Sequence, residues 1–166
     1  MDETIINNWN NKVHKDDQVF ILGDFCWGTE EQWIEYLQQL KGIKTLIRGN
    51  HDIKKMSSKC RNLLTDIKDY KEINDNGRKI IMSHYPILCY KHSYNPKTYM
   101  LFGHVHNRTQ ESLFVEKWID DIKANCIENF HNKGQLYNVG CMMPWMNYAP
   151  QTLDEIIANY NNWKGL

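Results

Sequence analysis

A strand–helix–strand unit near the start of the chain most constrains the fold. The apolar runs "QVFILG" at 18–23 and "IKTLIR" at 43–48 each predict a buried strand. The segment "TEEQWIEYLQQLKG" between them predicts a helix, with Thr29 and Gln32 as a capping box and Gly42 as its C-cap. A crossover of this size joins two parallel strands, so the unit predicts an α/β fold.

The rest of the chain continues this alternation of strands and helices. Residues 2–13 place apolar side chains on one helical face, and "DNG" at 75–77 is a hairpin-turn signal. Further elements are predicted as strands at 78–84, 98–104 and 135–140, a helix over 110–129 with Leu113, Trp118, Ile122 and Cys126 at helical spacing, and a last helix after Pro150 with Thr152 and Glu155 as its capping box. No repeat or linker interrupts the pattern, so residues 1–166 predict a single α/β domain.

Composition and charge argue against a nucleic-acid or membrane partner. Lys and Arg total 20, as do Asp and Glu, so the chain lacks the basic excess that a nucleic-acid groove or a membrane surface requires. Its apolar runs are too short for a spanning helix, and its polar N-terminus does not resemble a signal peptide. The five cysteines are scattered without a CxxC pair, which favours a reduced, cytoplasmic protein over a disulfide scaffold.

Four predicted strands end in side chains that commonly ligate metals. In chain order these ends are Gly23-Asp24, Gly49-Asn50-His51-Asp52, His84, and Gly103-His104-Val105-His106. In open α/β sheets, ligands bind at the carboxyl ends of the strands. The mixture of carboxylate, amide and imidazole donors suits first-row metals such as Mn, Fe or Zn better than a thiolate site or an all-oxygen calcium cage. The pattern therefore predicts a metal site built from Asp24, Asn50, His84, His104 and His106.

Each of these residues taken alone also has a structural interpretation. Asp24 and Asn50 suit turns or helix caps, and His84 suits a core position where the backbone satisfies it. Arg48 and Asn107 are candidate substrate-binding residues at the rim, although Arg48 equally suits a salt bridge. The aromatic residues near the motifs suit either stacking on a base or aryl group or ordinary packing: Trp27, Tyr85, Tyr90, Trp145 and Tyr148. The joint order of the motifs, each at a strand end, favours a functional site.

In these motifs the chain resembles the calcineurin-like metallophosphoesterase superfamily, especially its small single-domain bacterial and phage phosphoesterases. The matching stretches are "GDF" at 23–25, "GNHD" at 49–52, "SH" at 83–84 and "GHVH" at 103–106. "RGNHD" is also similar to the serine/threonine protein phosphatases, but "GDFCWG" lacks their Asp-Arg-Gly, so that branch is not assigned. The resemblance implies a four-layer α/β/β/α sandwich with two divalent metal ions, drawn from Mn, Fe, Zn, Ni and Mg.

The resemblance also implies a role for each matching residue. Five of them would be metal ligands: Asp24 bridging both ions, Asn50, His84 and His104 on the second ion, and His106 on the first. His51 would be the catalytic residue beside the leaving group, and Asp52 would orient it. The implied reaction is hydrolysis of a phosphomonoester or phosphodiester, in which a metal-activated hydroxide attacks phosphorus.

The chain departs from the family pattern upstream of Asp24. The family begins with Asp-x-His at the end of its first strand, and both residues bind the first metal, whereas the first histidine here is His14, and Lys12 stands two residues before it. The chain thus resembles a member without its N-terminal strand, so we expect an incomplete first-metal site and one well-held ion. An exposed sheet edge would favour a homo-oligomer. An alternative to the enzyme is a truncated or degenerate member that binds metal, phosphate or protein with little catalysis.

Overall fold

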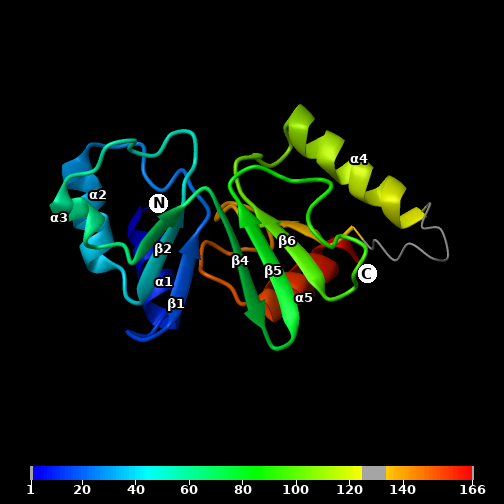
Figure 1. Cartoon of the computed structure of the whole chain (residues 1–166), viewed down its shortest axis with the longest axis horizontal. Coiled ribbons are helices and arrows are strands. Elements are labelled where there is room, and N and C mark those ends of the chain that lie inside the picture. Colours follow the sequence, from blue (N-terminus) through cyan, green and yellow to red (C-terminus); the bar gives the residue numbers. More distant parts are fainter. Residues whose placement is uncertain (1, 125–133, 166) are drawn as a thin grey trace.

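The computed structural model describes residues 2–124 and 134–165, which form two β-sheets and five helices (Figure 1). The elements in chain order are α1 (Asp2–Lys12), β1 (Gln18–Ile21), α2 (Glu30–Gln39), β2 (Ile43–Ile47), α3 (Ser58–Arg61), β3 (Asp66–Lys68), β4 (Tyr70–Asp75), β5 (Arg78–Ser83), β6 (Thr98–Phe102), α4 (Gln110–Ala124), β7 (Leu136–Asn138) and α5 (Leu153–Lys164). Each predicted strand and helix has a counterpart among them, and the short helix α3 was not predicted.

The first sheet is three-stranded and parallel, in the order β1-β2-β3. The predicted strand–helix–strand unit is confirmed, because β1 pairs with β2 in parallel and α2 connects them. The capping box of Thr29 and Gln32 is also present. The described residues contain no strand before β1, which therefore lies at an edge of this sheet.

The turn from α2 to β2 differs from the prediction. The helix ends at Leu40 in extended conformation, and Gly42 lies two residues beyond that C-cap. The ammonium group of Lys44 donates to the carbonyl oxygens of Leu40 and Gly42 at 2.7 and 3.1 Å. A buried lysine thus satisfies carbonyl groups at the end of this helix, and its burial lowers the pKa of Lys44.

The second sheet is four-stranded, in the order β4-β5-β6-β7. The predicted hairpin is confirmed, because β4 and β5 are antiparallel and joined by Asn76 and Gly77, both with positive φ. Strands β5, β6 and β7 are mutually parallel. A single residue, Asp69, separates β3 from β4, so the chain passes directly from one sheet into the other.

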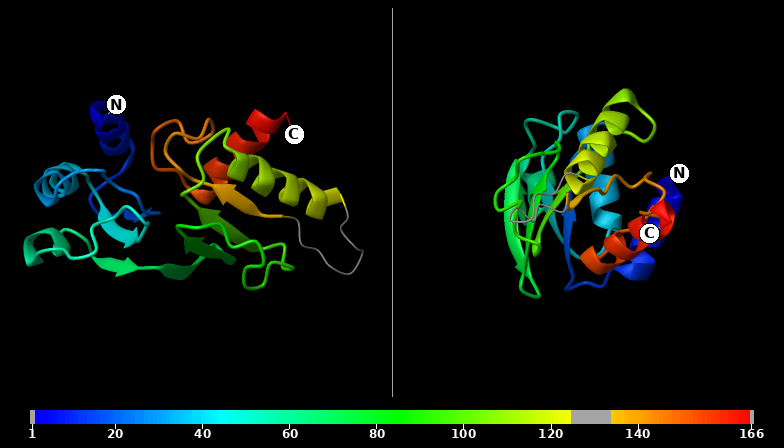
Figure 2. Two further views of the ribbon diagram at one scale, coloured as in Figure 1. Left: turned by 90° about the horizontal axis from the view of Figure 1, so that it is seen from above. Right: turned by 90° about the vertical axis from the view of Figure 1, so that its right-hand side faces the viewer.

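Helices cover the outer faces of the two sheets, and the inner faces share a hydrophobic core. Helices α1, α2 and α3 pack on the first sheet, and α4 packs on the second. Figure 2 shows α1–α3 beside the first sheet and α4 with α5 beside the second. The shared core includes Ile47 of β2, Met82 of β5 and Tyr160 of α5. The predicted fold class, an α/β/β/α sandwich, is confirmed.

The helix over 110–124 packs through a different stripe from the one predicted. Leu113 is 63% exposed, whereas Val115 and Ile119 are buried against the second sheet. Trp118 packs at the border of the same cluster. Cys126, the last member of the predicted stripe, lies outside the described residues.

An ion-pair network ties the hairpin to the last helix. The guanidinium group of Arg78 donates to Asp75 at 2.7 Å and to the carboxylate of Asp154 in the first turn of α5. The predicted capping box of Thr152 and Glu155 begins this helix. Across the part of the chain that the structure describes, no helix has the length and apolar character needed to cross a membrane.

Candidate metal centre

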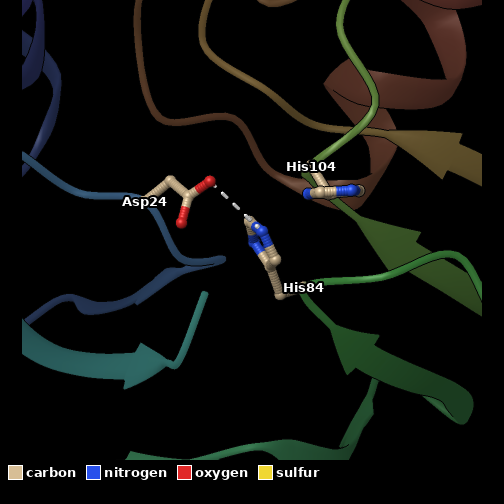
Figure 3. A group of neighbouring side chains, drawn as sticks. All are labelled: Asp24, His84 and His104. Atoms are coloured by element: carbon tan, nitrogen blue, oxygen red, sulfur yellow. Dashed lines mark ion pairs between the residues drawn. The ribbon is translucent and has the colours of Figure 1, made fainter. Parts of the chain in front are cut away.

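Three of the five predicted metal ligands converge where strands of both sheets end. Asp24 follows β1, His84 follows β5 and His104 follows β6 (Figure 3). One ligand atom from each of these side chains lies within 4.8 Å of the other two. The site is therefore assembled from both sheets, as expected for polar side chains at the carboxyl ends of parallel strands.

The hydrogen bonds of His84 define which ring nitrogen faces the site. Its Nδ1 lies 2.7 Å from the carbonyl oxygen of Leu22, and because a carbonyl only accepts, Nδ1 is the donor. Its Nε2 then faces the Asp24 carboxylate at 3.4 Å and the Asn50 amide oxygen at 3.1 Å. The His84 ring is only 2% exposed. A cation between Nε2 and these two oxygens would satisfy all three, which is the usual arrangement of a metal-ligating histidine.

Two glycines allow the strand ends to meet at this point. A Cβ atom on Gly49 would lie 2.5 Å from the Asp24 backbone nitrogen and 2.9 Å from Cε1 of His84. A Cβ atom on Gly23 would lie 2.6 Å from the backbone nitrogen of Gly49. Glycine at these positions keeps the Asp24 carboxylate and the His84 ring within reach of one ion.

Two of the converging residues hold an unfavourable backbone conformation. Asp24 has φ 51° and His104 has φ 59°, in the left-handed region that side chains other than glycine rarely adopt. Such conformations persist where the surrounding structure imposes them, and they are frequent at functional sites. The unfavourable backbone conformations of Asp24 and His104 therefore support a functional role for this site.

The carboxylate of Asp52 connects two backbone segments. It is buried, and its oxygens accept hydrogen bonds from the backbone N–H groups of Phe25 at 2.9 Å and Gly49 at 2.7 Å. The backbone N–H of His51 donates to Asp24 at 2.9 Å, while its exposed imidazole lies on the ring of Trp27. The contacts of Asp52 are thus with the loops that carry Asp24 and Asn50, and the described neighbour of the His51 ring is Trp27.

The remaining predicted site residues lie outside the group of three. His106 is exposed, and its carbonyl oxygen accepts from the Thr109 hydroxyl at 3.0 Å. Arg48 is exposed, and its Nε lies 3.9 Å from the Asp69 carboxylate. Arg48 therefore forms a salt bridge, which was the alternative to substrate binding. Asn107 is half-buried in the turn before α4. His106 is not a member of the group of three whose ligand atoms lie within 4.8 Å of one another.

Sequence reasoning missed Asn138, which braces the loop carrying His104. The buried amide of Asn138 donates to the Val105 carbonyl at 2.6 Å and accepts from the Gly140 N–H at 2.9 Å. Its own carbonyl accepts from the Trp145 indole at 2.7 Å. A lone asparagine ending an otherwise apolar strand was the available signal, because a buried amide needs partners.

Exposed aromatic rings border the site on two loops. The ring of Tyr85, 48% exposed, lies 4.6 Å from the His104 ring and 5.1 Å from the His84 ring. The indole of Trp27, 76% exposed, lies 4.2 Å from the His51 ring. These two aromatic side chains therefore contact the histidines of the site directly, whereas Tyr90 and Trp145 are buried in the core.

Comparison with known proteins gives relatives along almost the whole chain. A family model described as calcineurin-like phosphoesterase matches residues 3–154. An uncharacterised protein of Methanocaldococcus jannaschii is 30% identical over 160 residues, which cover 95% of this chain and 73% of that protein. A protein of unknown function from Aquifex aeolicus, known from its crystal structure, is similar with a TM-score of 0.59 and 27% identity, covering 95% of this chain and 83% of that chain. The family match includes every strand end that contributes to the site.

Proposed function

The chain belongs to the calcineurin-like phosphoesterase family, and on that premise we propose that it hydrolyses a phosphomonoester or phosphodiester with a bound divalent metal ion. One observation carries the proposal for this chain. In the buried His84 ring, Nδ1 donates a hydrogen bond to a backbone carbonyl. Nε2 faces the Asp24 carboxylate and the Asn50 amide oxygen. That arrangement leaves an imidazole nitrogen and two oxygens around one point, and it fits a metal ion.

Each residue of the site has a proposed role. Asp24, Asn50, His84 and His104 hold the ion, for which Mn, Fe, Zn, Ni and Mg are candidates. When bound, such an ion supplies Lewis-acid chemistry that activates water and offsets charge on the phosphate. His51, exposed at the border of the site, holds a proton for the oxygen of the leaving group.

The position of His106 supports a chain that holds one ion well. The family's first metal would rely here on Asp24 and His106, but His106 is exposed and lies outside the group formed by Asp24, His84 and His104. Two protein ligands hold a divalent ion poorly. Metal analysis after dialysis should therefore give one manganese ion per chain, and two tightly held ions per chain would contradict this.

The wider setting is also part of the proposal. The thiols of Cys60, Cys89 and Cys141 are free, which supports a reducing, cytoplasmic location. The edge position of β1 supports pairing with a second copy of the chain, which sedimentation can test. The hydrophobic core that both sheets share supports a single domain over 1–166.

A second candidate function is a binding module with little hydrolysis. One observation favours it: among the described residues, the group of Asp24, His84 and His104 covers only one of the two metal positions of the family. The module would bind metal, phosphate or protein through the same face. It differs from the enzyme in hydrolysing phosphate esters little.

Hydrolysis of chromogenic esters separates the two candidates. The wild-type chain, loaded with Mn²⁺, is given p-nitrophenyl phosphate and bis-p-nitrophenyl phosphate, with His84→Gln and His51→Ala as controls. The enzyme predicts turnover of at least one ester that His84→Gln abolishes, while His51→Ala lowers it only modestly because p-nitrophenolate leaves as a stable anion. Wild-type turnover no higher than that of His84→Gln would leave the module alone.

A further inference from the structure

The indole of Trp27 is unusually exposed for so large an apolar side chain. It is 76% exposed, and its described ring contact is with His51, at 4.2 Å between centroids and 31° between planes. Trp27 lies three residues after Asp24, on the loop that leaves β1. The loop therefore places a large, exposed aromatic ring against the exposed imidazole of His51.

The loop that carries Trp27 is fixed on both sides of it. On one side, the backbone N–H of Phe25 donates to Asp52 at 2.9 Å, and the carbonyl of Cys26 accepts from the Trp33 indole at 3.0 Å. On the other side, Gly28 packs so closely that a Cβ atom there would lie 3.0 Å from the Cys26 sulfur. The capping box at Thr29 follows immediately. Trp27 is therefore presented by a constrained loop.

The ring of His51 meets the Trp27 indole at an angle of 31° between planes. Its backbone is fixed by the N–H bond to Asp24, but the Asp52 carboxylate is already engaged by the backbone of Phe25 and Gly49. A ring stacked through its face keeps both nitrogens at its free edge. Stacking on Trp27 can therefore set the plane of the imidazole without occupying the nitrogen that faces a leaving group.

We infer that Trp27 is the positioning residue of His51, and that it fulfils the role which a carboxylate partner would otherwise have. The inference rests on the proposed function, because it gives His51 its part at the leaving oxygen. A misaligned His51 slows esters whose leaving oxygen needs a proton. It hardly affects esters whose leaving group departs as a stable anion. Trp27 should therefore govern turnover of alkyl esters far more than turnover of nitrophenyl esters.

The test compares Trp27→Ala and Trp27→Phe with the wild type, each loaded with Mn²⁺. Trp163→Ala is the matched control, since Trp163 is another exposed tryptophan, on α5. Turnover is measured with p-nitrophenyl phosphate and with an alkyl ester, glycerol phosphate. Trp27→Ala should lower kcat about tenfold for the alkyl ester and less than threefold for the nitrophenyl ester, with KM unchanged. Trp27→Phe should recover most of the loss, and Trp163→Ala should match the wild type.

A second readout does not depend on activity. The stacked indole shifts the ring protons of His51 upfield in NMR spectra, where His51→Gln identifies their signals. Trp27→Ala should move those signals toward ordinary values, and Trp27→Phe should retain part of the shift. Unchanged His51 signals in Trp27→Ala, or an equal fall in kcat for both esters, would overturn the inference. If the wild type hydrolyses no ester, the proposed function fails, and the NMR comparison still decides whether Trp27 positions His51.

Discussion

The inner and outer parts of the site are built in different ways. The inner part, formed by Asp24, His84 and His104, lies against both sheets, and its central ring of His84 is nearly inaccessible. The outer part, formed by His51 and His106, consists of exposed side chains. His84 is held by the carbonyl of Leu22, whereas the ring of His51 lies on Trp27.

This difference predicts separate roles for the two parts, metal binding for the inner part and ester turnover for the outer part. A buried histidine held by the backbone is already in the geometry that a metal needs, so the cost of ordering it is met when the chain folds. An exposed histidine whose ring contacts one aromatic side chain stays accessible, so under the proposed function it can reach the leaving oxygen of a bound ester. Changes in the inner part should therefore alter metal affinity and stability, and changes in the outer part should alter turnover.

The largest expected effect is the loss of metal binding on replacing His84. His84→Gln removes the nitrogen that faces Asp24 and Asn50, and the affinity for Mn²⁺ should fall at least about 100-fold in calorimetric titration. The matched replacement in the outer part, His106→Gln, should lower the affinity by less than about tenfold. Equal losses in the two variants would show that the distinction between inner and outer parts is wrong.

Crowding the meeting point of the strand ends should have the next largest effect. Gly49→Ala places a methyl group 2.5 Å from the Asp24 backbone nitrogen, so the loops must separate. The free energy of unfolding should fall by about 3 kcal/mol in urea titration, with weaker Mn²⁺ binding. Gly77→Ala, in the hairpin turn where a Cβ meets nothing within 4 Å, should cost only about 1 kcal/mol and leave metal binding intact. A Gly49→Ala protein with normal stability and affinity would refute the close approach.

Removing the brace behind His104 should have a smaller effect. Asn138→Ala leaves the Val105 carbonyl and the Gly140 N–H without their side-chain partner in a buried place. Unfolding should become easier by about 2 kcal/mol, and Mn²⁺ affinity should fall several-fold because His104 loses support. Asn95→Ala, on an exposed loop, serves as the control and should change neither quantity. Stability loss without any change in affinity would limit Asn138 to a role in folding.

The smallest expected effect concerns the scaffold far from both parts of the site. The hydrogen bonds from Arg78 hold the pKa of the Asp154 carboxyl below its usual value. The interaction therefore stabilises the fold above the pKa of an unfolded aspartate, about 4, and is lost as pH falls through the lower folded pKa. Arg78→Gln should flatten the acid side of the stability–pH profile while leaving neutral-pH Mn²⁺ affinity unchanged. An altered affinity would mean that the scaffold and the inner part are coupled.

Much of the fold was predictable because local signals agreed with tertiary packing. Thr29 and Thr152 began their helices as capping boxes, and Asn76-Gly77 formed the hairpin turn. The exceptions depend on contacts made across the chain. The helix α2 ends at Leu40, whose carbonyl accepts from Lys44. Leu113 faces solvent, while Val115 and Ile119 meet the second sheet. A helical stripe does not identify which of its neighbours will be covered.

The inner part of the site was predictable for a similar reason. Side chains at the ends of parallel strands must gather at one edge, and Asp24, His84 and His104 do so. The outer part was not predictable, because adjacency of two residues in the sequence does not indicate where their side chains point. Asp52 follows His51 directly, yet its carboxylate accepts from Phe25 and Gly49. The contact of the His51 ring with Trp27 joins two loops that only the folded chain brings together.

The most direct test of the metal centre is diffraction from crystals of the full chain soaked in Mn²⁺, with data collected at the manganese absorption edge. We predict an anomalous peak roughly 2–2.3 Å from an Asp24 carboxylate oxygen, Nε2 of His84 and a ring nitrogen of His104. Soaked crystals of His84→Gln should lose that peak. A manganese peak elsewhere, with none among these three side chains in the folded wild-type chain, would contradict the account.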